Sequence, residues 1–153
     1  MPSVKRLQWT ADIAASPESV YMHLTGSDSY NVWAKAFAEG SHFQGTWEEG
    51  KPMRFLSPSG DGMISEIATN RPNEFVSIRH LGFIMNGVED TTSESIRAWA
   101  PAYENYTIAR SAQGTKLTID QDVAAEWESY MADAWPKALA LLKALCERKA
   151  GDA

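Results

Sequence analysis

One histidine and one glutamate stand at positions where their side chains could meet and do chemistry. His80 closes a predicted strand, on the same face as Ile78. Glu104 falls on the inward side of a later strand, together with Tyr106. If the two strands pair in antiparallel fashion, the imidazole and the carboxylate come together across them. Such a pair could orient the polar group of a ligand or transfer protons as acid and base, and the alternative is a histidine that is only hydrogen-bonded within a sheet.

Other chemistries lack the residue patterns that they need. His23 and His42 have no cysteine or carboxylate at the spacing of metal ligands, so the sequence predicts no metal site. The run Gly60-Asp61-Gly62 is typical of a hairpin turn rather than of a phosphate-binding loop, and no serine lies in a nucleophile-elbow pattern. We therefore assign no catalytic residue from the sequence and expect no cofactor.

Large aromatic side chains are abundant for a chain of 153 residues, with six Trp, five Tyr and five Phe. Apolar binding sites use such side chains as walls, with a few polar groups among them. The predicted lining of a pocket is Trp33, Phe37, Phe55, Phe83, Trp99, Tyr106 and Trp135, for each of which plain core packing is the alternative. Together with His80 and Glu104, these residues form the predicted ligand-binding set.

The elements that must position these residues are predicted from the spacing of apolar and turn-forming residues. Alternating apolar side chains predict a first strand over residues 4–14. Ser16 can cap a short helix that begins at Pro17 and ends near Leu24, and a second short helix follows Gly26. Turn signals then separate a set of antiparallel strands, which we place at residues 43–48, 51–56, 63–68, 75–81, 103–110 and 115–123.

Two longer segments complete the pattern. Residues 81–103 form a connection that contains Glu and Ser, and a connection of this length is usually a functional lid or a mobile segment. Apolar residues then recur at steps of three and four from Ala125 to Arg148, which predicts a long helix lying across the sheet. Pro136 falls in the middle of that helix, where it cannot donate a backbone hydrogen bond, so we expect a bend.

Three short runs carry a family resemblance: Arg79-His80-Leu81-Gly82, Glu104-Asn105-Tyr106-Thr107 and Trp135-Pro136-Lys137-Ala138-Leu139. The chain resembles bacterial single-domain proteins similar to the activator of heat-shock protein 90 ATPase, a branch of the SRPBCC or START-like superfamily. The resemblance implies an α+β helix-grip fold of the START/Bet v-like kind. In this fold a curved antiparallel sheet of six to seven strands wraps around a long C-terminal helix, with two short helices after the first strand. Residues 1–153 then form one domain with a cavity between sheet and helix.

Charge and cysteine content narrow the location and the partners. The 14 Lys and Arg against 20 Asp and Glu give a net charge of -6 without a basic run, so nucleic acid and anionic membranes are not expected as partners. No window of 18 apolar residues could span a membrane. The single Cys146 lies in an apolar helical stretch, where it should pack as a small hydrophobic residue. We expect a cytoplasmic protein.

The aromatic residues and the resemblance together favour one function over two others. The leading hypothesis is the binding of a small, mostly apolar molecule in the cavity between the sheet and the C-terminal helix, without catalysis. The first alternative is a cyclase- or dehydratase-like enzyme that uses the same pocket. The second is a co-chaperone-like module that binds a protein through the outer surface of the sheet. We do not expect a chaperone partner, because the co-chaperone of this branch grips its chaperone through a separate domain for which we find no residues here. A homodimer is compatible with the sequence.

Overall fold

An antiparallel sheet curves around a long helix in the computed structural model, which describes residues 4–148. Its strands are β1 (Val4–Ile13), β2 (His42–Gly45), β3 (Pro52–Leu56), β4 (Gly62–Arg71), β5 (Phe75–Met85), β6 (Val88–Asp90), β7 (Ala102–Ser111) and β8 (Gly114–Ala124). Its helices are α1 (Pro17–Thr25), α2 (Ser27–Trp33), α3 (Glu94–Trp99) and α4 (Glu128–Glu147), with short 3₁₀ helices η1 (Ala34–Ala36) and η2 (Ala125–Trp127). The chain is therefore α+β, as predicted.

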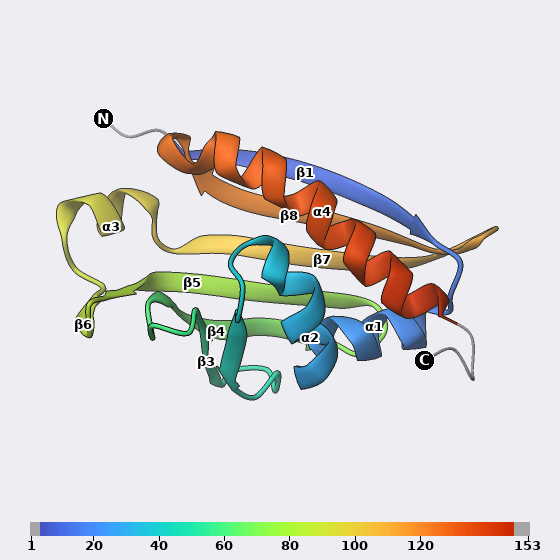
Figure 1. Ribbon diagram of the computed structural model, residues 1–153. Helices are drawn as coiled ribbons and strands as arrows, with labels where there is room; N and C mark the ends of the chain where they lie inside the picture. Colours follow the sequence, from blue (N-terminus) through green and yellow to red (C-terminus); the bar gives the residue numbers. More distant parts are fainter. Residues whose placement is uncertain (1–3, 149–153) are drawn as a thin grey trace.

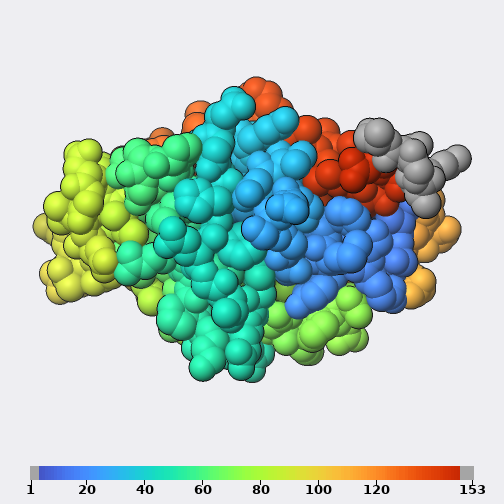
Figure 2. Space-filling model, turned by 60° about the horizontal axis from the view of Figure 1, so that its bottom comes forward, coloured from blue at the N-terminus to red at the C-terminus, as the bar shows by residue number. Residues whose placement is uncertain are grey.

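The helices cover one face of the sheet and leave the other open. Helix α4 runs diagonally over β1, β8 and β7, and α1 and α2 lie on the same face (Figure 1). Helix α3 and strand β6 lie at one end of the sheet, and α1 lies at the other end. A space-filling view from below shows α1 and α2 beside the strands β2 and β3, with the β6 region again at the far end (Figure 2).

Local sequence signals explain where the first helix begins and ends. Ser16 caps α1, because its hydroxyl oxygen accepts a hydrogen bond from the backbone N–H of Ser19 at 3.1 Å. Pro17 occupies the first helical position, where a missing N–H costs nothing. The backbone N–H of Gly26 donates to the carbonyl of Met22 and ends the helix. The predicted start of this helix is confirmed.

The sheet order is β1-β8-β7-β5-β4-β3-β2, with β6 paired to β5 as an eighth strand. The prediction of six to seven strands was therefore one short. The missed strand follows a tight turn at Asn86 and Gly87, whose φ angles of 52° and 78° are left-handed, as an Asn-Gly hairpin requires. A Cβ at Gly82 would lie 2.2 Å from the carbonyl oxygen of Asp90, so only glycine allows β6 to approach β5 this closely.

An irregularity between β4 and β5 changes which side chains face the helices. The consecutive residues Ile64 and Ser65 pair with Gly82 and His80, which leaves one extra residue in β5. Strand residues alternate between the two faces, and an extra residue reverses the alternation beyond it. His80 and Phe83 therefore lie on the same face although they are three positions apart, and both stack on the tryptophan that ends α3.

Helix α4 supplies the central part of the core. Trp135, Ala138 and Leu142 are buried between the helix and the sheet, together with Cys146 near its end. Pro136 lies inside the helix, as the sequence requires. Burial raises the pKa of the Cys146 thiol to about 12, so this cysteine stays protonated at neutral pH and packs as an apolar side chain. None of the helices within residues 4–148 is long and apolar enough to cross a membrane.

Residues 81–103 are not a structureless connection, because they contain the end of β5, the strand β6 and the helix α3. Both added elements are short and lie at one end of the sheet, so we still expect them to open more readily than the central strands. Backbone amides of β6 and α3 should exchange with solvent faster than those of β8, which pairs on both sides with β1 and β7. Hydrogen exchange measured by mass spectrometry tests this expectation. Equal protection of the two regions would contradict it.

Candidate functional site

A cavity of about 580 Å³ lies between the sheet and the helices α2, α3 and α4. Its walls are mostly aromatic, and they come from both ends of the chain and from its middle. The aromatic side chains that line it are Tyr30, Trp33, Phe37, Phe55, Phe83, Trp99, Trp127, Tyr130 and Trp135. Six of the seven aromatic residues predicted from the sequence are among them, and the seventh, Tyr106, is buried directly behind the wall.

The aromatic walls are held together by contacts between the rings. Trp135 lies at the centre of the cluster, with its ring centroid 4.9 Å from that of Phe37 and 6.2 Å from that of Trp33. At the other side of the cavity, Phe83 and Trp99 stack at 4.9 Å. Edge-to-face and stacked pairs at these distances are favourable, so the ring contacts hold the walls of the cavity together.

A hydrogen-bonded chain of buried polar residues lies behind one wall of the cavity. Nε2 of His80 lies 3.0 Å from Oε1 of Glu104, and Nδ1 of His80 lies 2.7 Å from the hydroxyl of Ser65. The imidazole is almost fully buried, at 1% exposure, and its ring stacks on Trp99. The predicted meeting of His80 and Glu104 is confirmed. Glu104 pairs with the residue two positions before His80, so the two side chains are diagonal neighbours.

The carboxylate of Glu104 has further donors on its other side. Nε2 of Gln121, directly opposite on β8, donates to Oε1 at 3.0 Å. The hydroxyl of Tyr106 donates to Oε2. Burial, with the nearby carboxylate as a second cause, raises the pKa of Tyr106 well above its ordinary value, so the hydroxyl remains a donor. Gln121 in turn accepts from Nε1 of Trp135 at 2.9 Å. Glu104 and Gln121 line the cavity, and they are its polar groups on this wall.

The order Ser65, His80, Glu104 has the connections of a nucleophilic triad, but the geometry does not support that chemistry. Ser65 is 2% exposed and does not line the cavity. His80 is likewise separated from the cavity by Trp99 and Glu104. A serine nucleophile must reach its substrate with its base beside it. The chain of hydrogen bonds therefore serves to hold and satisfy the carboxylate of Glu104.

Sequence reasoning missed two members of this chain, Ser65 and Gln121. Both are polar residues at inward positions of strands whose neighbouring inward residues, such as Ile67 and Ile119, are apolar. In β8, alternation from Leu117 through Ile119 places Gln121 on the buried face. The same reasoning that singled out Glu104 could have found Gln121. Ser65 was harder to find, because its pairing with His80 lies at the extra residue of β5, and the sequence does not show where that residue falls.

The mouth of the cavity is rimmed by exposed apolar side chains. Seven large apolar residues are exposed in the described part of the chain, and five of these line this cavity: Val4, Met85, Val88, Trp127 and Tyr130. The starts of β1 and α4 and the β6 and α3 region all lie at one end of the sheet (Figure 1). Exposed apolar side chains that gather around an opening mark a site of interaction.

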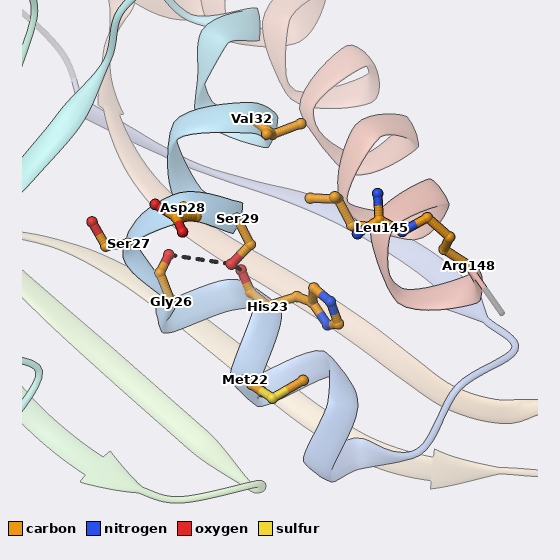
Figure 3. Close-up of a pocket in the computed structure, with 9 residues that line it drawn as sticks. All are labelled: Met22, His23, Gly26, Ser27, Asp28, Ser29, Val32, Leu145 and Arg148. Atoms are coloured by element: carbon orange, nitrogen blue, oxygen red, sulfur yellow. Dashed lines mark hydrogen bonds between the residues drawn. The ribbon is translucent and has the colours of Figure 1, made fainter. Parts of the chain in front are cut away.

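The other two exposed apolar residues, Met22 and Val32, line a second pocket of about 480 Å³ between α1, α2 and the end of α4. Figure 3 shows His23 on α1, Leu145 on α4 and Arg148 directly after the end of α4. Two of its polar side chains have local partners: Nδ1 of His23 lies 2.8 Å from the carbonyl oxygen of Ser19, and the hydroxyl of Ser29 donates to the carbonyl of Gly26. Among the residues that the structure describes, this pocket has no Trp, Tyr or Phe in its lining and no buried carboxylate, so the cavity around Glu104 is the better candidate site.

Comparison with solved structures identifies the fold of the chain, whereas comparison of sequences finds no relative. No protein-family model and no curated protein matches this sequence. Among solved structures, protein MLL2253 from Mesorhizobium loti superposes with a TM-score of 0.72 at 14% identity, over 97% of this chain and 100% of its own. The Aha1 dimer from Colwellia psychrerythraea gives 0.71 at 19% identity, over 96% and 99%. The chain has the helix-grip fold.

A third similar structure is that of a protein from a biosynthetic gene locus. DynU16, a protein in the dynemicin biosynthetic locus, superposes with a TM-score of 0.62 at 16% identity, over 90% of this chain and 47% of DynU16. At identities this low, a structural likeness shows the fold and not the chemistry. Membership of the predicted family stays a prediction, and the function must be argued from the cavity itself.

Proposed function

We propose that this domain binds a small, mostly apolar molecule in the cavity between the sheet and α4. The observation that supports the proposal most is an aromatic cavity of about 580 Å³ with the buried carboxylate of Glu104 in one wall. Ligand pockets have volumes of roughly 300 to 1,000 Å³ and combine apolar walls with a few placed polar groups. At about 30 Å³ for each water-sized group in a liquid, the cavity fits roughly 20 non-hydrogen atoms.

The proposed ligand-binding set consists of the predicted aromatic residues that line the cavity and Glu104. His80 and Tyr106 are supports that hold the carboxylate of Glu104 through hydrogen bonds.

The two alternative functions receive less support. Acid and base catalysis needs both groups within hydrogen-bond reach of the substrate. Of the two residues His80 and Glu104, only Glu104 lines the cavity, and this favours binding over a cyclase- or dehydratase-like reaction. Protein binding through the outer face of the sheet would use an apolar patch, whereas that face carries ion pairs such as Arg6 with Asp122 and Arg79 with Glu66.

Filling the cavity tests the proposal. Met63 lines the cavity from β4, and Met63→Trp places a larger side chain in the space that a ligand would occupy. We expect this variant to bind the uncharged dye N-phenylnaphthylamine at least about tenfold more weakly than the unchanged protein, since steric overlap costs about 1 to 3 kcal/mol. A fluorescence titration measures the affinity. Protein purified from its native host should also carry a small molecule that mass spectrometry detects.

The matched control is the same substitution in the second pocket. Met22 is 59% exposed on α1, and Met22→Trp should leave dye binding unchanged. Weaker binding in Met22→Trp, together with normal binding in Met63→Trp, would move the site to the pocket between α1, α2 and α4. No dye binding in the unchanged protein would overturn the proposal.

A further inference from the structure

The charged residues around the cavity all have the same sign. Of the five acidic residues in its lining, Asp61, Asp90, Glu104 and Glu126 present their charge to it, whereas the carboxylate of Asp122 lies on the outer face of the sheet with Arg6. Within residues 4–148, no Lys, Arg or His side chain lines it. A low-dielectric cleft lined by one sign of charge concentrates the field that a ligand meets. The charge of a ligand should therefore affect its binding in this cavity, as its apolar surface does.

The acidic side chains near the mouth are held in place by local hydrogen bonds. Asp61 accepts from the backbone N–H of Asn86 at 2.9 Å. Hydrogen bonds from Ser93 lower the pKa of Asp90, so this carboxylate is ionised at neutral pH. For Asp122, burial acts to raise the pKa, but hydrogen bonds from Arg6 and from a backbone N–H outweigh it and the pKa is lowered. Arg6 offsets the charge of Asp122.

The deepest charge belongs to Glu104, whose hydrogen bonds fit an ionised carboxylate. A neutral His80 with its proton on Nε2 donates to Glu104 and accepts from the hydroxyl of Ser65, so one neutral tautomer satisfies both contacts. The bonds from His80, Gln121 and Tyr106 occupy three of the roughly four acceptor positions of the carboxylate. One acceptor position, on Oε2, has no donor among residues 4–148, and Glu104 lines the cavity.

Aromatic walls complete a site for a cation. The faces of Trp, Tyr and Phe attract ammonium groups, and the attraction grows where water is excluded. Trp33 and Trp135 line the cavity together with Glu104, and Tyr30 is close enough for the charge of Glu104 to raise its pKa, after the larger effect of burial. A charge-assisted hydrogen bond to the carboxylate and ring faces around it are the two contacts that an alkylammonium group uses.

We propose that the ligand of this cavity has an apolar body and a protonated amine, and that the cavity disfavours fatty acids and other carboxylates. The ammonium group donates to the open acceptor position of Glu104, and the apolar body lies between the aromatic walls and extends toward the apolar mouth. This inference rests on the proposed binding function and adds the charge class of the ligand.

Three probes of one shape test the inference: phenylbutylamine, phenylbutanol and phenylbutanoate. We expect the amine to bind with a Kd about tenfold lower than that of the alcohol, the size of a cation–π or charge-assisted contact, and the carboxylate to bind most weakly. Isothermal titration calorimetry at pH 7 measures all three. In Glu104→Gln the charge is lost and the shape is kept, so the ratio of amine to alcohol affinity should fall toward one.

The control is the same substitution at an exposed turn. Glu74→Gln changes the net charge equally but lies outside the cavity, and it should keep the preference for the amine. Circular dichroism checks that both variants fold. If Glu104→Gln does not fold, the comparison of the three probes with the unchanged protein still tests the inference. If the carboxylate binds as tightly as the amine or more tightly, and the alcohol also binds, the amine preference is overturned and the binding function stands. Failure of all three probes to bind overturns both.

Discussion

Replacing Trp135 by alanine is expected to lower the free energy of unfolding by about 3 to 5 kcal/mol, the range measured for large aromatic residues in protein cores. Trp135 is 2% exposed and contacts the rings of Trp9, Phe37 and Tyr106. Its indole also donates to Gln121, so the substitution removes a hydrogen-bond donor as well as the packing. Urea denaturation followed by far-ultraviolet circular dichroism measures the loss.

Trp127 provides the matched control for this substitution. It lies in η2 at the start of the same helical segment and is 44% exposed at the cavity mouth. Trp127→Ala should change the free energy of unfolding by less than about 1 kcal/mol, as surface substitutions usually do. If Trp135→Ala lost no more than Trp127→Ala, the packing of α4 on the sheet would not be the main source of stability.

Replacing Glu104 by leucine should cost about as much, roughly 3 to 5 kcal/mol in total, because each buried donor left without an acceptor costs about 1 to 3 kcal/mol. Leucine has nearly the same size but accepts no hydrogen bond. His80, Gln121 and Tyr106 would each keep a buried donor without its acceptor. The free energy of unfolding from urea titrations at neutral pH is again the measurement.

Glu104→Gln separates the charge from the hydrogen bonds. The amide oxygen can still accept from His80 and Gln121, and the hydroxyl of Tyr106 can rotate to accept from the amide nitrogen. We expect a loss of about 1 kcal/mol, close to one hydrogen bond. Equal losses for the leucine and glutamine variants would show that the charge, and not the hydrogen-bonded network, is what stabilises this part of the sheet.

Most strands and the long helix follow from the sequence because their signals are local. Alternation predicts β1, β7 and β8 to within a residue or two, and the spacing of apolar residues predicts α4. The hairpin that adds β6 carries an Asn86-Gly87 signal, but the expectation of a long connection hid it. The extra residue in β5 has no local signal, because it is defined by how two strands pair.

The candidate site was predictable to the extent that it depends on alternation within strands. Glu104 and His80 face inward as their positions in the strands require, and their contact follows once the strands are neighbours. Which aromatic residues line a cavity and which pack behind it depends on the distance between helix and sheet, and the sequence does not contain that distance. Tyr106 illustrates the point, because it is inward-facing as expected and yet lies behind the wall.

The apolar rim has a thermodynamic consequence for any molecule that enters the cavity. Side chains such as Met85 and Val88, 61% and 66% exposed, stand in water while the cavity is empty. A ligand that reaches the mouth covers them, and removal of apolar surface from water lowers the heat capacity. The enthalpy of binding then becomes more favourable as the temperature rises. Ligands too short to reach the rim lack this contribution, so the heat capacity change of binding reports how far along the cavity a ligand extends.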